Sequence, residues 1–237
     1  MQAVERLPHD EPDGAAPMQI MVGAKPWAYL QSGPADGPAI VLVHGFGGDL
    51  RDWSATVPEL ARRARVIVVD LPGHGGSSKE SDFHCINDLA RRLACFVDAI
   101  GVERAHLVGH CVGGAVVALM ALGRPGLCES LTLIAPIGLG DEIDAACLSG
   151  RGGDAQRSIH AAMAIGDRQR LSLLPDLVKL DVPVRVIWGA QDSIVPAAHA
   201  GGLPSHFRIH VLPEAGHMVH MERAKEVNAI LAEVFET

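Results

Sequence analysis

Cys111, Asp192 and His217 are residues whose types and order along this chain could perform covalent chemistry. Cys111 lies in the sequence GHCVG, directly after the apolar run 105–108, and this pattern predicts a strand, a sharp turn and a helix start. Glycines on both sides of the turn permit a bend that is too tight for side chains, so the sulfur is held out of the sheet. Because a helix N-terminus favours an anion, the pattern predicts a thiolate nucleophile.

Asp192 and His217 follow two further predicted strands, 184–188 and 209–212. Nucleophile, acid and base then occur in the chain order that is typical of a nucleophile elbow. In this arrangement His217 takes the thiol proton and later activates the acceptor, while Asp192 orients the imidazole and stabilises its cation. Each residue also has a structural interpretation, since free cysteines are often buried and an aspartate at a strand end can cap a helix.

The glycine-rich sequence HGFGG at 44–48 follows the apolar run 39–43. Acyl-transfer chemistry needs main-chain N–H donors that hold an oxyanion, and we expect these donors at Phe46 and Val112. The alternative is an ordinary glycine-rich turn. The segment lacks the spacing of a phosphate-binding loop, so we do not expect a nucleotide there.

Other residues are expected around these groups. We interpret His44, Gly45 and His110 as supports whose positions are set by the turns. His217 and His220 are three residues apart, but the HExxH spacing of a zinc site is missing, so we expect no metal and no other cofactor. Hydrophobic residues near the predicted strand ends are candidate walls of a substrate pocket: Trp53, Ile137, Leu139 and Val195.

Apolar runs alternate with helical segments along the chain, which predicts an α/β fold with a mostly parallel, doubly wound sheet. In such a sheet the site forms beyond the carboxyl ends of the strands, where the residues above all fall. The predicted strands are 18–22, 27–30, 39–43, 66–69, 105–108, 130–134, 184–188 and 209–212. The predicted helices are 53–63, 86–100, 112–122 and 222–235.

The domain organisation is expected to be simple. Residues 1–17 are rich in Pro, Asp and Glu and are predicted to form a flexible tail, and 18–237 a single domain. Residues 138–180 interrupt the alternation and are predicted to form a reduced lid. Its expected helical pieces are 141–148, 155–165 and 169–174.

Composition excludes several kinds of partner. The 237 residues carry a formal net charge of -8 and no basic stripe, which argues against a nucleic acid or an anionic membrane surface. No apolar run approaches the roughly 18 residues of a membrane span. Five cysteines without disulfide spacing, and no apolar leader, favour a cytoplasmic protein.

With these motifs in place, the chain resembles the α/β-hydrolase superfamily from Met18 onward, through HGFGG, DLPGHGGS, GHCVGG, GAQDSIVP and EAGHMVHME. More narrowly, it is similar to the hydrolase-type domain of the acetoin-dehydrogenase acetyltransferase component. It departs from that family by Cys111 in place of the nucleophilic Ser and by a shortened lid. The family usually carries a lipoyl-bearing segment before this domain, which the present sequence does not contain, so the resemblance does not extend to lipoamide acetylation. Either the pocket is open, or a second copy closes it in a homodimer through the lid.

The expected function is cofactor-free hydrolysis of a small-molecule ester or thioester, free or presented on a carrier, through a covalent acyl group on Cys111. Because thioesters react readily with other nucleophiles, transfer of the acyl group to an amine, alcohol or thiol is the first alternative. A non-covalent lyase or C–C hydrolase and a non-catalytic ligand-binding relative are the others.

Overall fold

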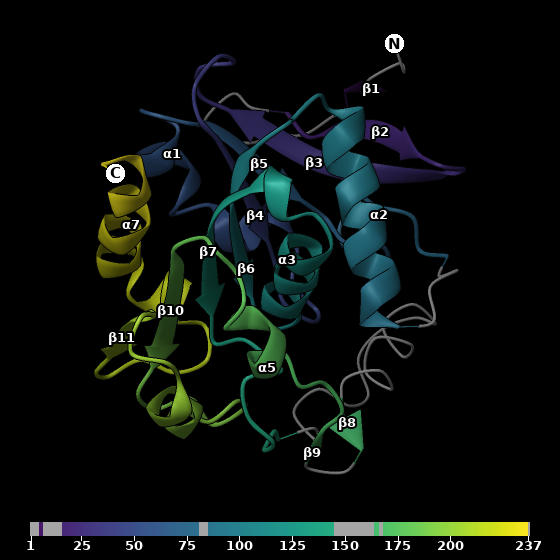
Figure 1. Ribbon diagram of the computed structural model, residues 1–237. Helices are drawn as coiled ribbons and strands as arrows, with labels where there is room; N and C mark the ends of the chain where they lie inside the picture. Colours follow the sequence, from purple (N-terminus) through teal and green to yellow (C-terminus); the bar gives the residue numbers. More distant parts are fainter. Residues whose placement is uncertain (1–4, 7–15, 81–84, 145–163, 166–167, 237) are drawn as a thin grey trace.

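The computed structural model describes residues 5–6, 16–80, 85–144, 164–165 and 168–236 (Figure 1). Within these residues a nine-stranded sheet has the order β1-β2-β3-β5-β4-β6-β7-β10-β11. Neighbours from β5 to β11 are parallel, whereas β1, β2, β3 and β5 pair antiparallel. The predicted mostly parallel sheet is therefore confirmed. Its strands are β1 Glu5–Arg6, β2 Met18–Val22, β3 Lys25–Ser32, β4 Ala39–Val43, β5 Arg65–Val69, β6 Ala105–His110, β7 Cys128–Ile134, β10 Val184–Gly189 and β11 Arg208–Leu212.

Helices cover both faces of the sheet, as Figure 1 shows. Residues 40–43 of β4 are fully buried, because alternate side chains enter two different cores. Val41 and Val43 pack in the cluster that contains residues of α2 and α3, and Ile40 and Leu42 in the cluster under α1 and α7. The main helices are α1 Val57–Leu60, α2 Ile86–Ala99, α3 Val112–Gly123, α5 Leu174–Leu177, α6 Val219–Glu222 and α7 Ala224–Ala232. The short 3-10 helices are η1 Leu50–Trp53, η2 Pro125–Leu127, η4 Ala197–Gly202 and η5 Glu233–Phe235.

Two predicted helices are divided in the structure. The expected helix 53–63 is replaced by η1 and the single turn α1, in which Pro58 lies in the first turn. A continuous helix would place Pro58 in its interior, where proline lacks the N–H donor and clashes with the preceding turn. The expected helix 222–235 begins earlier and is divided into α6, α7 and η5.

The predicted lid also differs where the structure describes it. Instead of a helix over 169–174, strand β9 (Arg168–Gln169) pairs antiparallel with β8 (Ala164–Ile165), and α5 begins only at Leu174. Residues 141–144 are not helical, because their backbone bonds to other segments: Asp144 N–H donates to the carbonyl of Ile194 at 2.8 Å. The rest of the predicted pieces 141–148 and 155–165, apart from β8, lies outside the described residues.

The N-terminal segment contains structure that the sequence did not predict. Glu5 and Arg6, within the expected tail, pair with Gln19 and Met18 of β2. No helix in the described part of the chain combines the length and apolar character that crossing a membrane requires.

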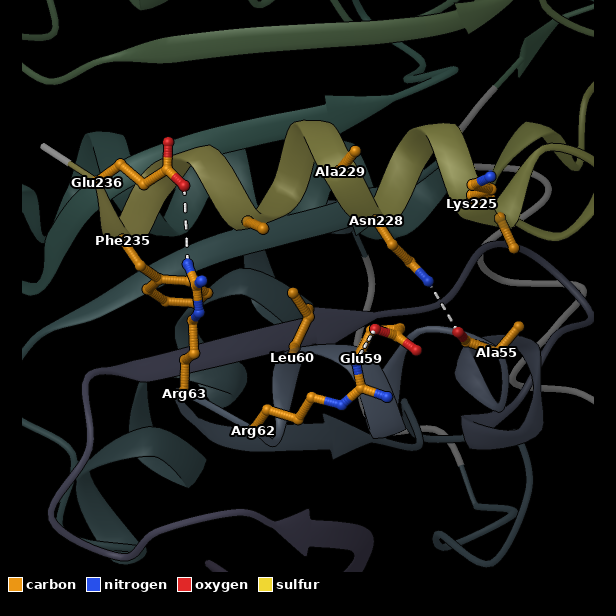
Figure 2. A pocket seen from close by; sticks show the side chains of 12 residues that line it. Ala55, Glu59, Leu60, Arg62, Arg63, Lys225, Asn228, Ala229, Phe235 and Glu236 are labelled. Carbon is orange, nitrogen blue, oxygen red and sulfur yellow. Dashed lines mark hydrogen bonds and ion pairs between the residues drawn. The ribbon is translucent and has the colours of Figure 1, made fainter.

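Helices α1 and α7 border a groove of about 800 Å³, shown in Figure 2. Ion pairs at its rim join Glu59 to Arg62 and Arg63 to Glu236. Asn228 on α7 donates from its side-chain amide to the carbonyl of Ala55 at 2.8 Å. None of the predicted catalytic residues lines this groove.

Candidate active site

The sharp turn predicted at Cys111 is present between β6 and α3. Cys111 has φ 51° and ψ -114°, a conformation that non-glycine residues rarely adopt. A Cβ at Gly109 would lie 2.2 Å from the carbonyl oxygen of Gly113, and a Cβ at Gly113 would lie 2.4 Å from that of Val43. Both positions therefore require glycine, and α3 begins directly after the cysteine. The predicted strand, turn and helix start are confirmed.

Asp192 and His217 lie next to Cys111. His217 Nδ1 donates to Asp192 Oδ2 at 2.8 Å, and the His217 ring forms a hydrogen bond with the Cys111 side chain. The side chains of His217 and Asp192 are 10% and 0% exposed. Cys111 itself is 1% exposed, so the sulfur is buried in this structure rather than open to solvent. The three residues come from the ends of three different strands and form one continuous chain of contacts.

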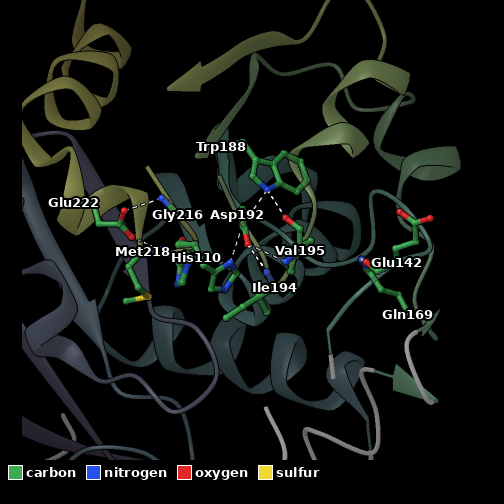
Figure 3. A network of polar contacts seen from close by, with 11 residues as sticks. His110, Glu142, Gln169, Trp188, Asp192, Ile194, Val195, Gly216, Met218 and Glu222 are labelled. Atoms are coloured by element: carbon green, nitrogen blue, oxygen red, sulfur yellow. Dashed lines mark hydrogen bonds and ion pairs between the residues drawn. The ribbon is translucent and has the colours of Figure 1, made fainter. Parts of the chain in front are cut away.

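Both carboxylate oxygens of Asp192 accept hydrogen bonds, several of which Figure 3 shows. Its Oδ1 accepts the N–H groups of Ile194 and Val195, both at 2.9 Å. Its Oδ2 accepts the indole N–H of Trp188 at 3.2 Å in addition to His217. The Trp188 indole also donates to the carbonyl of Val195 at 2.9 Å, which ties the turn to the end of β10. The contact between Trp188 and Asp192 was not predicted from the sequence, although a tryptophan at the end of a predicted strand, four residues before Asp192, was the available signal.

The His217 imidazole has a strongly altered acidity. Burial lowers the pKa of His217, but its electrostatic interactions and hydrogen bonds with Cys111 and Asp192 raise it to about 10. The cationic imidazole is thus stabilised by the two groups that it contacts. An imidazole whose cationic form is stabilised in this way is suited to take up a proton from a neighbouring group.

The HGFGG loop lies directly against Cys111. A Cβ at Gly45 would lie 3.0 Å from the Cβ of Cys111 and 2.7 Å from Nδ1 of His110, so only glycine fits. His44 shapes the loop from inside: its Nδ1 donates to the Gly45 carbonyl at 2.7 Å and its Nε2 accepts the N–H of Leu71 at 3.0 Å. The backbone of Phe46, the next residue, belongs to this same turn.

His110 lies behind the His217 ring. Its Nε2 donates to the carbonyl of His217 at 3.0 Å, and its ring centroid is 4.7 Å from that of His217 and 4.5 Å from that of His220. On the other side of His220, the centroid of the Trp53 ring lies 4.7 Å from that of the His220 ring. Trp53 is fully buried in the core under α1 and α7. The sequence-based assignment of Trp53 as a pocket wall is therefore replaced by a core position, because its ring fills the space behind the histidines.

The other candidate wall residues pack in the same region as Cys111. Ile137 donates its N–H to the carbonyl of Cys111 at 3.4 Å. Ile137, Leu139 and Val195 belong to the same hydrophobic cluster as Cys111. All three are buried, and Val195 also holds Asp192 through its backbone. The structure thus brings these three side chains to the region of the site.

No group of three or more His, Cys, Asp or Glu residues able to hold a metal occurs among the residues that the structure describes.

The buried histidines predict a loss of stability in acid. Burial lowers the pKa of His44 to about 4, and those of His74 and His220 to about 3. An unfolded chain binds these protons near pH 6.5, so the stability that the neutral rings contribute is present above pH 6.5 and is lost as the pH falls toward 4. His217 has a raised pKa and is protonated in both states in this range, so it does not offset the loss.

Three such rings give a slope of about 4 kcal/mol per pH unit between roughly pH 6 and 4. Urea unfolding followed by circular dichroism at several pH values measures this slope. Replacement of His74 by Gln should reduce it, whereas the same change at the exposed His206 should not. A free energy of unfolding that is flat from pH 6.5 to 4.5 would contradict the prediction.

Comparison with known proteins agrees with this geometry. A model of the alpha/beta hydrolase fold matches residues 38–155. The chain is 37% identical, over 92% of its length and 69% of the relative's, to the dihydrolipoyllysine-residue acetyltransferase component of the acetoin cleaving system of Pseudomonas putida. It is 32% identical to the corresponding component of Cupriavidus necator, over 81% of this chain and 62% of that protein, which is less than two thirds of its length.

Solved structures show the same fold. The meta-cleavage product hydrolase of Pseudomonas fluorescens IP01 superimposes with a TM-score of 0.80 at 22% identity, over 92% of this chain and 97% of that one. A carboxylesterase of Bacillus subtilis superimposes with a TM-score of 0.78 at 18% identity, over 94% of this chain and 92% of that one. The sheet order, the elbow at the end of β6 and these likenesses show that the chain belongs to the α/β-hydrolase family of enzymes.

Proposed function

We propose that the protein hydrolyses a small ester or thioester through a covalent acyl group on Cys111. The observation that carries this proposal is the continuous contact from Asp192 through His217 to a cysteine in a nucleophile elbow. The raised pKa of His217 supports it, because an imidazolium beside the sulfur stabilises the attacking thiolate.

In the first half of the proposed reaction, Cys111 Sγ bonds to the carbonyl carbon, and the carbonyl electron pair moves onto oxygen. The N–H groups of Phe46 and Val112 hold this oxyanion. The tetrahedral intermediate then collapses, the bond to the leaving alcohol or thiol breaks, and His217 supplies the proton that the leaving group needs.

In the second half, His217 removes a proton from water, and the resulting hydroxide attacks the Cys111 thioester. Collapse of this intermediate releases a carboxylic acid and returns the thiolate and the imidazolium. Asp192 keeps the ring in the required tautomer through its 2.8 Å bond to Nδ1. Every proton in the cycle is carried by residues of this chain or by water.

Transfer to an acceptor other than water is the second candidate. It is favoured by the 37% identity to a protein named as an acetyltransferase component. A Cys thioester is attacked readily by thiols and amines, so an acceptor that reaches the site would compete with water. Adding a dithiol such as dihydrolipoamide during ester turnover distinguishes the two: transfer gives acyl-dithiol as the main product, and hydrolysis gives free acid.

Trapping the acyl group tests the covalent step. After brief mixing with 4-nitrophenyl acetate and an acid quench, peptide mass analysis should find one acetyl group on the peptide that contains Cys111. Cys111→Ala should remove this adduct. Cys95→Ala is the matched control, since Cys95 is an exposed free cysteine outside the site and its loss should leave the Cys111 adduct unchanged.

Two outcomes would reject the proposal. Turnover that persists in Cys111→Ala would indicate chemistry without a covalent intermediate, as in a lyase. Tight binding of an apolar ligand with no turnover of any activated ester would indicate a binding protein.

A further inference from the structure

The segment that carries His217 is a short connection between β11 and α6. It runs from 213 to 218, and Glu214 within it has φ 56°, in the left-handed region. Such a connection has few backbone bonds of its own, so neighbouring groups must set the direction in which the imidazole points.

Glu222, at the end of α6, holds this segment on both sides of the histidine. Its Oε2 accepts the N–H of Gly216 at 2.7 Å, and its Oε1 accepts the N–H of Met218 at 3.2 Å. Figure 3 shows the Glu222 carboxylate reaching toward Gly216 and Met218. One carboxylate thus binds the residues immediately before and after His217.

Two more bonds complete the attachment of this segment. The carbonyl of His217 accepts the Nε2–H of His110, the residue before the nucleophile. The carbonyl of Ala215 accepts the N–H of Gln191 at 2.8 Å, the residue before the catalytic acid. The backbone around His217 is therefore tied to both of the turns that carry its partners.

We propose that Glu222 is a positioning residue that orients the His217 imidazole toward Cys111 and Asp192 by holding the N–H groups of Gly216 and Met218. The inference rests on the proposed function, because it assigns Glu222 a part in that reaction. Charge-assisted bonds from a carboxylate to N–H groups are stronger than neutral ones, and two bonds from one carboxylate restrain the residue between the two N–H groups. Displacements of about 1 Å in a catalytic group can cost about a hundredfold in rate.

Helix capping is the competing explanation for Glu222. The bond to Met218, the N-cap of α6, resembles the return bond of a capping box and would stabilise that turn alone. Gly216 lies outside the helix, however, and its bond to Glu222 is the shorter of the two. Capping alone predicts a change in stability without a specific change in the chemical step.

Glu222→Gln is the decisive variant, because its amide has one oxygen and can accept only one of the two N–H groups. We expect kcat for 4-nitrophenyl acetate to fall on the order of 10- to 100-fold with KM unchanged, since the ring and not the substrate is displaced. Glu226→Gln is the matched control: Glu226 lies four residues later, pairs with Arg223 and should leave kcat unchanged. Glu222→Asp retains the charge but shortens the reach, and it replaces Glu222→Gln in every measurement if that variant does not fold.

A second readout does not depend on turnover. In protein labelled at the histidine ring nitrogens, the NMR signals of His217 should shift in Glu222→Gln and stay unchanged in Glu226→Gln. If the wild type forms no acyl adduct but the His217 signals still shift in Glu222→Gln, the proposed function is rejected and the positioning role is retained. A Glu222→Gln variant with unchanged kcat and unchanged His217 signals, or one whose activity falls only as far as its folded fraction, would overturn the positioning role.

Discussion

Replacing His217 with Ala should lower kcat for ester hydrolysis by roughly a millionfold, because residues that act as one nucleophilic unit lose nearly all of their effect when the base is removed. The structure supplies the reason: the ring is the group that joins the sulfur of Cys111 to the carboxylate of Asp192. The measurement is the initial rate of 4-nitrophenyl acetate hydrolysis at saturating substrate, corrected for the rate without enzyme.

The double variant with Cys111→Ala shows whether the two residues act together. If they do, the double variant should be no slower than either single one, since both changes remove the same covalent step. His206→Ala removes an exposed histidine and serves as the matched control. A large loss in His217→Ala beside near-normal turnover in Cys111→Ala would instead assign the histidine to proton abstraction without a covalent intermediate.

Replacing Asp192 with Asn should lower kcat by about ten-thousandfold while the fold is retained. The Asn oxygen can still accept the N–H groups of Ile194 and Val195, so the turn after β10 keeps its shape. Its amide nitrogen is a donor and cannot accept the Nδ1–H of His217, which shifts the ring toward the wrong tautomer and removes the charge that stabilises its cation.

Steady-state kinetics and thermal unfolding of Asp192→Asn test this explanation together. The midpoint of unfolding should change little compared with the kinetic loss. Asp181→Asn, at an exposed position before β10, is the control for a change of charge alone. Kinetic parameters in Asp192→Asn within tenfold of the wild type would show that another group orients His217.

Much of the site could be predicted because its signals are local. The apolar runs 39–43 and 105–108 form strands for the same reason that makes them recognisable, burial on both faces of the sheet. The glycines around Cys111 are required by contacts within the turn and with β4, so they mark the elbow in the sequence itself. Asp192 and His217 could be proposed because each lies in the loop that follows a predicted strand, at the edge of the sheet where a site is expected.

Other features depend on contacts between distant segments. Trp53 was expected at the pocket by its position in the chain alone, but its ring packs on His220, which is far away in the sequence. Pro58 divides the helix predicted over 53–63, and hydrogen bonds between segments replace the expected helices in the described part of the lid. Periodicity reports which side of an element is apolar and not what that side will contact.

The sequence by itself determined the parallel sheet, the elbow at Cys111 and the placement of Asp192 and His217 after two further strands, because apolar runs, glycines and strand ends act over a few residues. Only the tertiary structure decided that Trp188 and Val195 hold Asp192, that Trp53 is a core residue and that Glu222 and His110 hold the backbone around His217. These arrangements join groups from different elements, and their distances follow from how the whole chain packs.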